Sequence, residues 1–138
     1  MTIKKKVNQL FKKYDTKKPF EIVKAMGIPI VYRPLGSQYG FFTNYYRTFV
    51  IHINENLPYE KQLYTLIHEL GHVVMHQDIN SAFLKANTYY MTDRYETEAH
   101  EFAIEMFYSQ DELKNVTFKE AVEVYGIPEQ LLEKKIYS

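Results

Sequence analysis

The sequence predicts an α+β fold that is mainly helical and contains one small sheet. Long segments repeat apolar residues with the 3.6-residue period of an amphipathic helix, whereas residues 28–54 are rich in β-branched and aromatic residues broken by turn residues. The chain has 138 residues, the usual size of one domain, and contains no internal repeat or long linker. We therefore expect a single domain, residues 1–138, with a three-stranded antiparallel sheet packed on one helix.

Two helices are expected in residues 1–27. In the first helix, apolar side chains recur at i, i+3, i+4 and i+7 and form one inward face: Val7, Leu10, Phe11 and Tyr14. The second helix begins at Pro19, because proline suits the first helical turn, and ends at Gly27, because glycine favours the position after a helix.

The sheet is expected in residues 28–54, as three short strands separated by turn residues. In the last strand Ile51 and Ile53 lie on one apolar face, and His52 points to the other face. We therefore expect His52 to be a sheet residue and not a metal ligand.

Three helical regions follow the sheet. Pro58 begins a helix over residues 58–77, and a polar, weakly periodic stretch separates it from a second helix over residues 92–109. The inward stripe of the second helix is Tyr95, Ala99, Phe102, Ala103 and Met106. A capping box formed by Thr117 and Glu120 begins a closing helix pair over residues 117–137.

The composition excludes several classes of function. Seventeen lysines and arginines balance seventeen aspartates and glutamates, so the chain lacks a general attraction to nucleic acid. The closing helix pair superficially resembles a helix-turn-helix, but Glu129 and Glu133 on its second helix would repel phosphate, and we favour packing over DNA binding. Neither a secretory signal nor a membrane-length apolar segment is present, so we expect a cytoplasmic protein without a membrane segment.

Residues 68–72, HELGH, match the H-E-x-x-H motif within a predicted helix. Side chains at i and i+4 share one helix face, so His68 and His72 can bind one metal ion. Glu69 is offset beside that ion, where a carboxylate can accept a proton from an attacking water. The competing interpretation is a coincidental pair of helical histidines. Gly71 favours a packed site, because a mid-helix glycine costs about 1 kcal/mol, and we expect it to allow close packing on the sheet.

A catalytic zinc ion usually has three protein ligands, and without cysteine the third must be histidine or carboxylate. At about 100° per residue, Glu96 lies about 65° from the centre of the inward stripe of its helix, Glu98 about 95° and His100 about 105°. Glu96 is therefore the preferred third ligand. The alternative is a surface carboxylate near a helix N-terminus. His76 is expected to line the cleft or cap its helix, and no tyrosine among Tyr89, Tyr90 and Tyr95 can be assigned as an oxyanion donor.

Three segments together resemble the ImmA/IrrE family of metallopeptidases: residues 51–57 (IHINENL), HELGH, and Glu96-x-x-Ala99-x-x-Phe102-Ala103. The resemblance covers most of the chain and implies a zincin-like fold, zinc ligands at His68, His72 and Glu96, and catalysis by Glu69. It also places His100 where related zinc peptidases carry an Asp or Asn that supports a ligand histidine. Residues 106–110 lack the proline with which many members end this helix, a departure that affects the helix end and not the metal site.

The resemblance also implies a substrate. Similar small members are encoded beside helix-turn-helix repressors of prophages and conjugative elements, and they cleave the repressor. The expected function is therefore zinc-dependent hydrolysis of a peptide bond in such a repressor. The alternative is a non-proteolytic, zinc-containing anti-repressor that sequesters the regulator, because the same ligands can serve a purely structural zinc ion.

Overall fold

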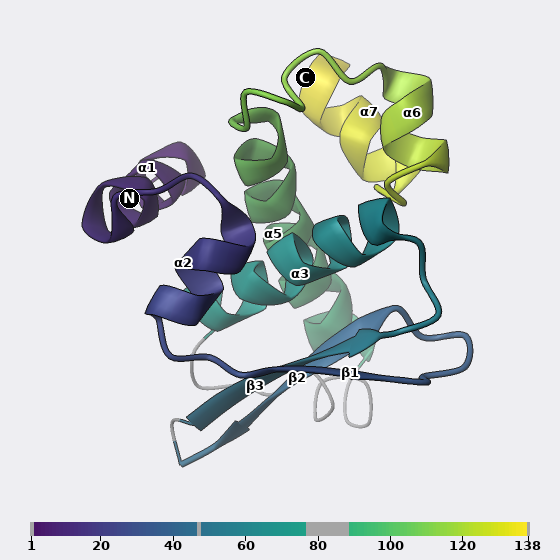
Figure 1. Ribbon diagram of the computed structural model, residues 1–138. Helices are drawn as coiled ribbons and strands as arrows, with labels where there is room; N and C mark the ends of the chain where they lie inside the picture. Colours follow the sequence, from purple (N-terminus) through teal and green to yellow (C-terminus); the bar gives the residue numbers. More distant parts are fainter. Residues whose placement is uncertain (1, 47, 77–88, 138) are drawn as a thin grey trace.

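The sheet lies on one side of the molecule and the helices lie on the other, with α3 (Tyr59–Met75) running along the sheet (Figure 1). The computed structural model describes residues 2–46, 48–76 and 89–137. The mainly helical α+β class predicted from the sequence is confirmed. Of the polar stretch that was expected after α3, residues 77–88 lie outside the described residues.

Capping residues and glycine mark the ends of the two N-terminal helices. The Thr2 hydroxyl accepts a hydrogen bond from the Lys5 N–H at the start of α1 (Ile3–Tyr14), and Asp15 ends that helix in a left-handed conformation with φ of 54°. Pro19 is the first residue of α2 (Pro19–Ala25), and Gly27, with φ of 75°, follows its end. Helix α1 contacts α5, and α2 contacts α3, so both cover the helical layer that carries the site.

The sheet has the order β1-β3-β2, formed by β1 (Ile30–Arg33), β2 (Gly40–Tyr45) and β3 (Thr48–Asn54). Strands β2 and β3 pair antiparallel, as expected. Strand β1 pairs with β3 in parallel, so the prediction of a wholly antiparallel sheet is wrong for this pair. The connection between β1 and β2 therefore does not close a hairpin but passes across the end of β3.

The end of β3 holds this crossing connection in place. The side-chain amide of Asn54 donates hydrogen bonds to the carbonyls of Gly36 and Gln38, at 3.0 and 2.9 Å. The backbone N–H of Asn54 donates to the Tyr39 carbonyl at 2.9 Å. Strand β3 also carries Ile51 and Ile53, which are fully buried, so it occupies the centre of the sheet. These bonds attach the connection to the end of β3, with β1 and β2 on opposite sides of that strand.

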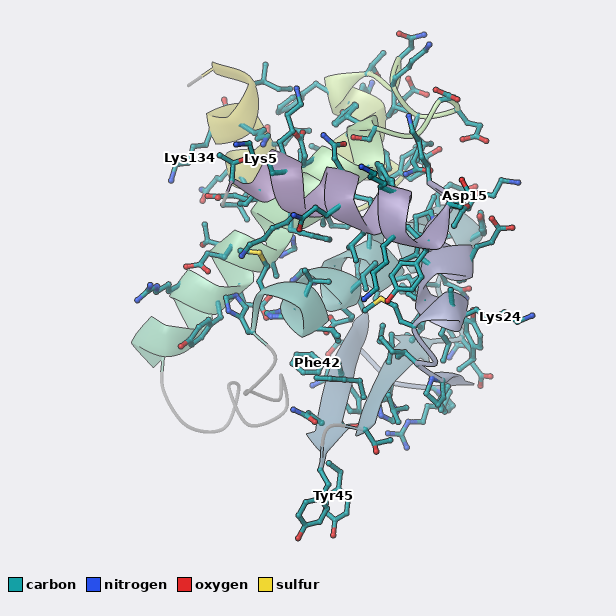
Figure 2. The ribbon with its side chains drawn as sticks, turned by 90° about the vertical axis from the view of Figure 1, so that its left-hand side faces the viewer. Lys5, Asp15, Lys24, Phe42, Tyr45 and Lys134 are labelled. Carbon is teal, nitrogen blue, oxygen red and sulfur yellow. The ribbon has the colours of Figure 1, made fainter. Side chains whose placement is uncertain are left out.

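One face of the sheet packs on α3. Phe42 is fully buried, and Figure 2 shows it in the interior beside the helices, whereas Tyr45 projects from the tip of the β2–β3 hairpin. Strand β2 approaches α3 closely at Gly40, where a Cβ would lie 2.7 Å from Thr65 Cγ2. The expected packing of the sheet on the helix that carries HELGH is confirmed.

Helix α3 also packs on α5 (Tyr89–Tyr108), and the two helices meet at Gly71. A Cβ at Gly71 would lie 2.8 Å from the carbonyl oxygen of Ala99 and 3.2 Å from Phe102 Cδ1. The close approach that we expected at Gly71 is present, but its partner is α5 and not the sheet. The reason is that Gly71 points away from the β2 side of α3, which Thr65 occupies.

The C-terminal helices are α6 (Phe118–Glu123) and α7 (Glu129–Tyr137). The capping box predicted at the start of α6 is confirmed, with the Thr117 hydroxyl accepting from the Glu120 N–H and the Glu120 carboxylate accepting from the Thr117 N–H. Helix α7 packs on α5 and buries Leu132 fully. Within the described residues, no helix has both the length and the apolar character needed to cross a membrane.

Candidate metal centre

The HELGH residues lie in the second half of α3, where the helix is covered by the sheet and by α5. The His72 side chain is fully buried, Glu69 is 3% exposed, and the His68 side chain is 13% exposed. The rings of His68 and His72 are 4.9 Å apart between centroids and tilted by 53°. One helical turn thus brings the two imidazoles of the motif together, as the i, i+4 spacing predicts.

Glu96 projects from α5 toward both histidines. Its Oε1 accepts a hydrogen bond from His72 Nε2 at 2.9 Å, and its Oε2 lies 3.2 Å from His68 Nε2. Although 24 residues separate His72 from Glu96 in the chain, the contact between α3 and α5 places both imidazoles against one carboxylate. The structure therefore brings together the three residues that the sequence singles out as candidate ligands.

A third histidine, His100 on α5, belongs to the same cluster. Donor atoms of His68, Glu96 and His100 all lie within 4.8 Å of one another, close enough to hold a metal ion. The rings of His68 and His100 are stacked, with centroids 3.8 Å apart and planes 9° apart. The candidate cluster thus comprises His68, His72, Glu96 and His100.

The electrostatics of the cluster favour an ionised carboxylate on Glu96 and a neutral ring on His100. Burial pushes the pKa of Glu96 upward, but the hydrogen bonds and charges of His68 and His72 outweigh burial and hold that pKa well below its usual range. Burial and the neighbouring His68 lower the pKa of His100 to about 2. A deprotonated carboxylate and a neutral imidazole are the forms in which these groups bind metal.

Buried polar atoms also mark this place as a functional site. Among the described residues, Glu69 Oε1 and His72 Nδ1 have no hydrogen-bond partner. The other carboxylate oxygen of Glu69, Oε2, lies 3.5 Å from His68 Nδ1. Buried polar groups without partners destabilise a fold and are uncommon, so the unpartnered oxygen of Glu69 marks a place where a bound species would complete the site.

A cavity of about 320 Å³ opens beside Glu69. Its walls come from α3, from α5, from the start of β2 and from the connection between α6 and α7: Tyr39, Gly40, Tyr64, Thr65, His68, Glu69, His100, Gly126 and Pro128. A larger cavity of about 450 Å³ lies between α2, the start of α3 and Tyr125, and none of the cluster residues lines it. We take the smaller cavity as the entrance to the site, because the chemistry lies on its wall.

Tyr64 belongs to the site and was missed in the sequence. Its hydroxyl lies 2.8 Å from His100 Nδ1, and the side chain lines the cavity. Burial and the charge of Glu96 raise the pKa of Tyr64, which keeps the hydroxyl protonated. The available signal was its position four residues before His68, the same spacing that joins His68 to His72.

The remaining candidates lie elsewhere. His76 caps the C-terminus of α3, where its N–H donates to the His72 carbonyl and its ring contacts Tyr95 with centroids 4.3 Å apart. His52 lies on the outer face of the sheet and stacks on Phe41, as expected for a sheet residue. The side chains of Tyr89 and Tyr90, also considered as oxyanion donors, lie outside what the structure describes.

Comparison with known proteins agrees with this arrangement. Residues 23–137 match the family described as the IrrE N-terminal-like domain. The chain is 32% identical over 139 residues to uncharacterized immunity region protein 2 of Bacillus phage phi105, covering 96% of this chain and 88% of the relative. It is 32% identical over 106 residues to metallopeptidase ImmA of Bacillus subtilis strain 168, covering 75% of this chain and 62% of ImmA. The family match and the cluster of metal-binding side chains support one conclusion: the chain belongs to the ImmA/IrrE family of metallopeptidases.

Proposed function

We propose that this chain is a zinc-dependent endopeptidase that cleaves a helix-turn-helix repressor of a mobile genetic element. In this proposal His68, His72 and Glu96 hold the zinc ion, and Glu69 is the catalytic base. The observation that carries the proposal is the convergence on Glu96, whose two oxygens lie 2.9 Å from His72 Nε2 and 3.2 Å from His68 Nε2.

The spacing of these atoms fits zinc. Bonds of about 2.0–2.1 Å in a tetrahedral site place the ligand atoms about 3.3–3.4 Å apart. The nitrogen–oxygen distances of 2.9 and 3.2 Å, one to each oxygen of Glu96, are close to that separation. Two histidines and one glutamate are also a ligand set that catalytic zinc sites use.

Ring orientation favours His72 over His100 as the second histidine ligand. A metal ion bound to an imidazole nitrogen lies near the plane of that ring. The planes of His68 and His100 are 9° from parallel and the rings are stacked, so one ion cannot lie in both planes. The rings of His68 and His72 are tilted by 53°, which allows their planes to meet at a common ion.

Glu69 supplies the proton transfers. When bound, zinc would lower the pKa of water to about 7 and polarise the peptide carbonyl. Glu69 lies on the cavity wall with Oε1 unpartnered among the described residues, so it can accept a proton from the attacking water and return it to the leaving amine. His68, the residue before Glu69, contacts Glu96. Glu69 therefore lies beside the proposed ligands and is not one of them.

The substrate is proposed to enter in an extended form along β2. This strand lies at one edge of the described sheet, and Tyr39 and Gly40 at its start line the cavity. An extended peptide can pair with such an edge through backbone hydrogen bonds. A repressor substrate is supported by the similarity to a phage immunity region protein and to metallopeptidase ImmA. Because such a repressor acts on DNA in the cytoplasm, we propose that the peptidase acts there too.

The test is cleavage of the repressor encoded beside this gene. Zinc-loaded protein is incubated with that repressor and the products are analysed by mass spectrometry. We expect fragments of the repressor from the wild type and from Glu60→Gln. This control makes the same substitution on α3, at a residue that does not line the cavity beside Glu69. Glu69→Gln is expected to keep stoichiometric zinc and yield intact repressor. Cleavage by Glu69→Gln at the wild-type rate contradicts the catalytic role, and a stable complex of uncut repressor with the wild type supports the anti-repressor alternative.

A further inference from the structure

Tyr64 and His100 form a fixed pair on the cavity wall. Tyr64 lies one turn before His68 on α3, and His100 lies one turn after Glu96 on α5. The Tyr64 hydroxyl is 2.8 Å from His100 Nδ1, a short hydrogen bond. The His100 ring also stacks on His68, so the hydrogen bond to Tyr64 and this ring contact together fix its orientation.

The surroundings of the ring decide which nitrogen carries the proton. If the Tyr64 hydroxyl donates to Nδ1, the proton of the neutral ring lies on Nε2, 3.8 Å from Glu96 Oε2. The reverse arrangement would turn the Nε2 lone pair toward this carboxylate oxygen, which is repulsive. It would also leave the buried hydroxyl proton of Tyr64 in need of another acceptor. The geometry therefore favours the Nε2–H form of His100.

The Nε2–H group of His100 does not form a hydrogen bond with Glu96. A separation of 3.8 Å exceeds the usual length of about 2.7–3.2 Å for a hydrogen bond from nitrogen to oxygen. His100 lines the same cavity as Glu69 and His68. A neutral N–H donor is therefore held at the wall of the cavity in which a peptide carbonyl would react.

We infer that His100 Nε2–H donates a hydrogen bond to the carbonyl oxygen that gains negative charge when water attacks the peptide bond, and that Tyr64 is a positioning residue that fixes this form of His100. The inference rests on the proposed peptidase function. Donors placed where charge develops contribute about 10²–10³-fold to kcat. The hydrogen bond forms without proton transfer from His100, so Glu69 remains the group that moves the proton.

The competing role for His100 is support of Glu96 or His68 as metal ligands, and binding measurements separate the two roles. The probe is acetohydroxamate, a small zinc chelator whose carbonyl oxygen can accept a hydrogen bond from the site. His100→Phe keeps a flat ring beside His68 and removes the donor, and the double variant Tyr64→Phe/His100→Phe also removes the hydroxyl that would lose its partner. His52→Phe, on the outer face of the sheet, is the matched control.

We expect both His100 variants to bind Zn²⁺ within about threefold of the wild type and to bind acetohydroxamate about tenfold or more weakly. In the zinc-loaded wild type, ¹⁵N NMR is expected to show the proton on His100 Nε2, and Tyr64→Phe is expected to reduce the population of that form. Unchanged acetohydroxamate affinity in both His100 variants, or a proton on Nδ1 in the wild type, overturns the inference. Zinc affinity that falls in parallel with acetohydroxamate affinity assigns His100 to ligand support instead. Wild-type protein that binds no zinc overturns the proposed metal site itself.

Discussion

Gly71 and Ala99 form the closest approach between the two helices that carry the candidate ligands: a Cβ at Gly71 would lie 2.8 Å from the Ala99 carbonyl oxygen. His72 follows Gly71 on α3, and Glu96 lies one turn before Ala99 on α5. The distance between the two helix axes at this point therefore sets the distance between the His72 imidazole and the Glu96 carboxylate. Glycine at position 71 is a requirement of the site as well as of the core.

Replacement of Gly71 by alanine is expected to destabilise the protein and weaken metal binding. Overpacking costs about 1–3 kcal/mol, and the better helix propensity of alanine offsets about 1 kcal/mol of it. Urea unfolding of the metal-free protein should therefore show a lower free energy of unfolding. Zinc affinity should fall as well, because α5 must move away from α3. A Gly71→Ala variant that is more stable than the wild type would show that α5 can move away from α3 without loss of stability.

Glu96→Gln is expected to reduce zinc affinity strongly. The substitution removes the charged ligand on which both imidazoles converge. Loss of a supporting hydrogen bond around a metal site costs about 10–100-fold in affinity, so loss of a direct ligand should exceed that range. Competition with a chelator measures the change. Glu105→Gln on the same helix is the control and should bind zinc as the wild type does; equal affinities for the two variants would remove Glu96 from the ligand set.

Zinc is expected to raise the melting temperature of the protein. Zinc ions at 100 times the dissociation constant stabilise the folded state by about 2.7 kcal/mol, roughly 10 °C for a domain of this size. Glu69→Gln should retain this shift, because Glu69 is not a proposed ligand, and His72→Gln should lose most of it. The comparison uses the difference between the melting temperatures of each variant with and without zinc. A lower stability of the metal-free His72 variant therefore does not affect it. A full shift in His72→Gln would exclude His72 as a ligand.

The helices and the pairing of His68 with His72 could be predicted because each depends on local spacing. Apolar residues repeat with the helical period, Thr117 and Glu120 satisfy a local capping pattern, and His68 and His72 are one turn apart. Glu96 required a geometric choice among several acids, and the structure places it against both histidines. These features follow from the 3.6-residue repeat, which the sequence displays directly.

Several features that depend on contacts between distant segments could not be predicted. The alternation of apolar residues in a strand is the same whether its neighbour is parallel or antiparallel, so nothing local in β1 showed that it pairs with β3 in parallel. Likewise, Gly71 indicated a close approach without naming α5 as its partner. Tyr64 was missed because its role depends on His100, 36 residues away, although its spacing from His68 placed it on the right face.

Replacement of Asn54 by alanine is expected to destabilise the connection that crosses the end of β3. The side chain is 3% exposed and donates hydrogen bonds to the carbonyls of Gly36 and Gln38, and it also accepts one from the Asn56 N–H. Alanine removes all three hydrogen bonds, each of which contributes about 0.5–1.5 kcal/mol to stability. Urea unfolding should show a lower free energy of unfolding for Asn54→Ala than for the wild type.

Asn56→Ala is the matched control for this substitution. Asn56 is exposed, and its hydrogen bond to Asn54 uses the backbone N–H, which alanine retains. The free energy of unfolding of Asn56→Ala should stay within about 0.5 kcal/mol of the wild-type value. Asn54→Ala should also weaken acetohydroxamate binding more than zinc binding, because the crossing connection leads into Tyr39 and Gly40 on the cavity wall, whereas the ligands lie on α3 and α5. If Asn54→Ala proves as stable as Asn56→Ala, the crossing connection is held by the strand pairing of β3 and not by the Asn54 side chain.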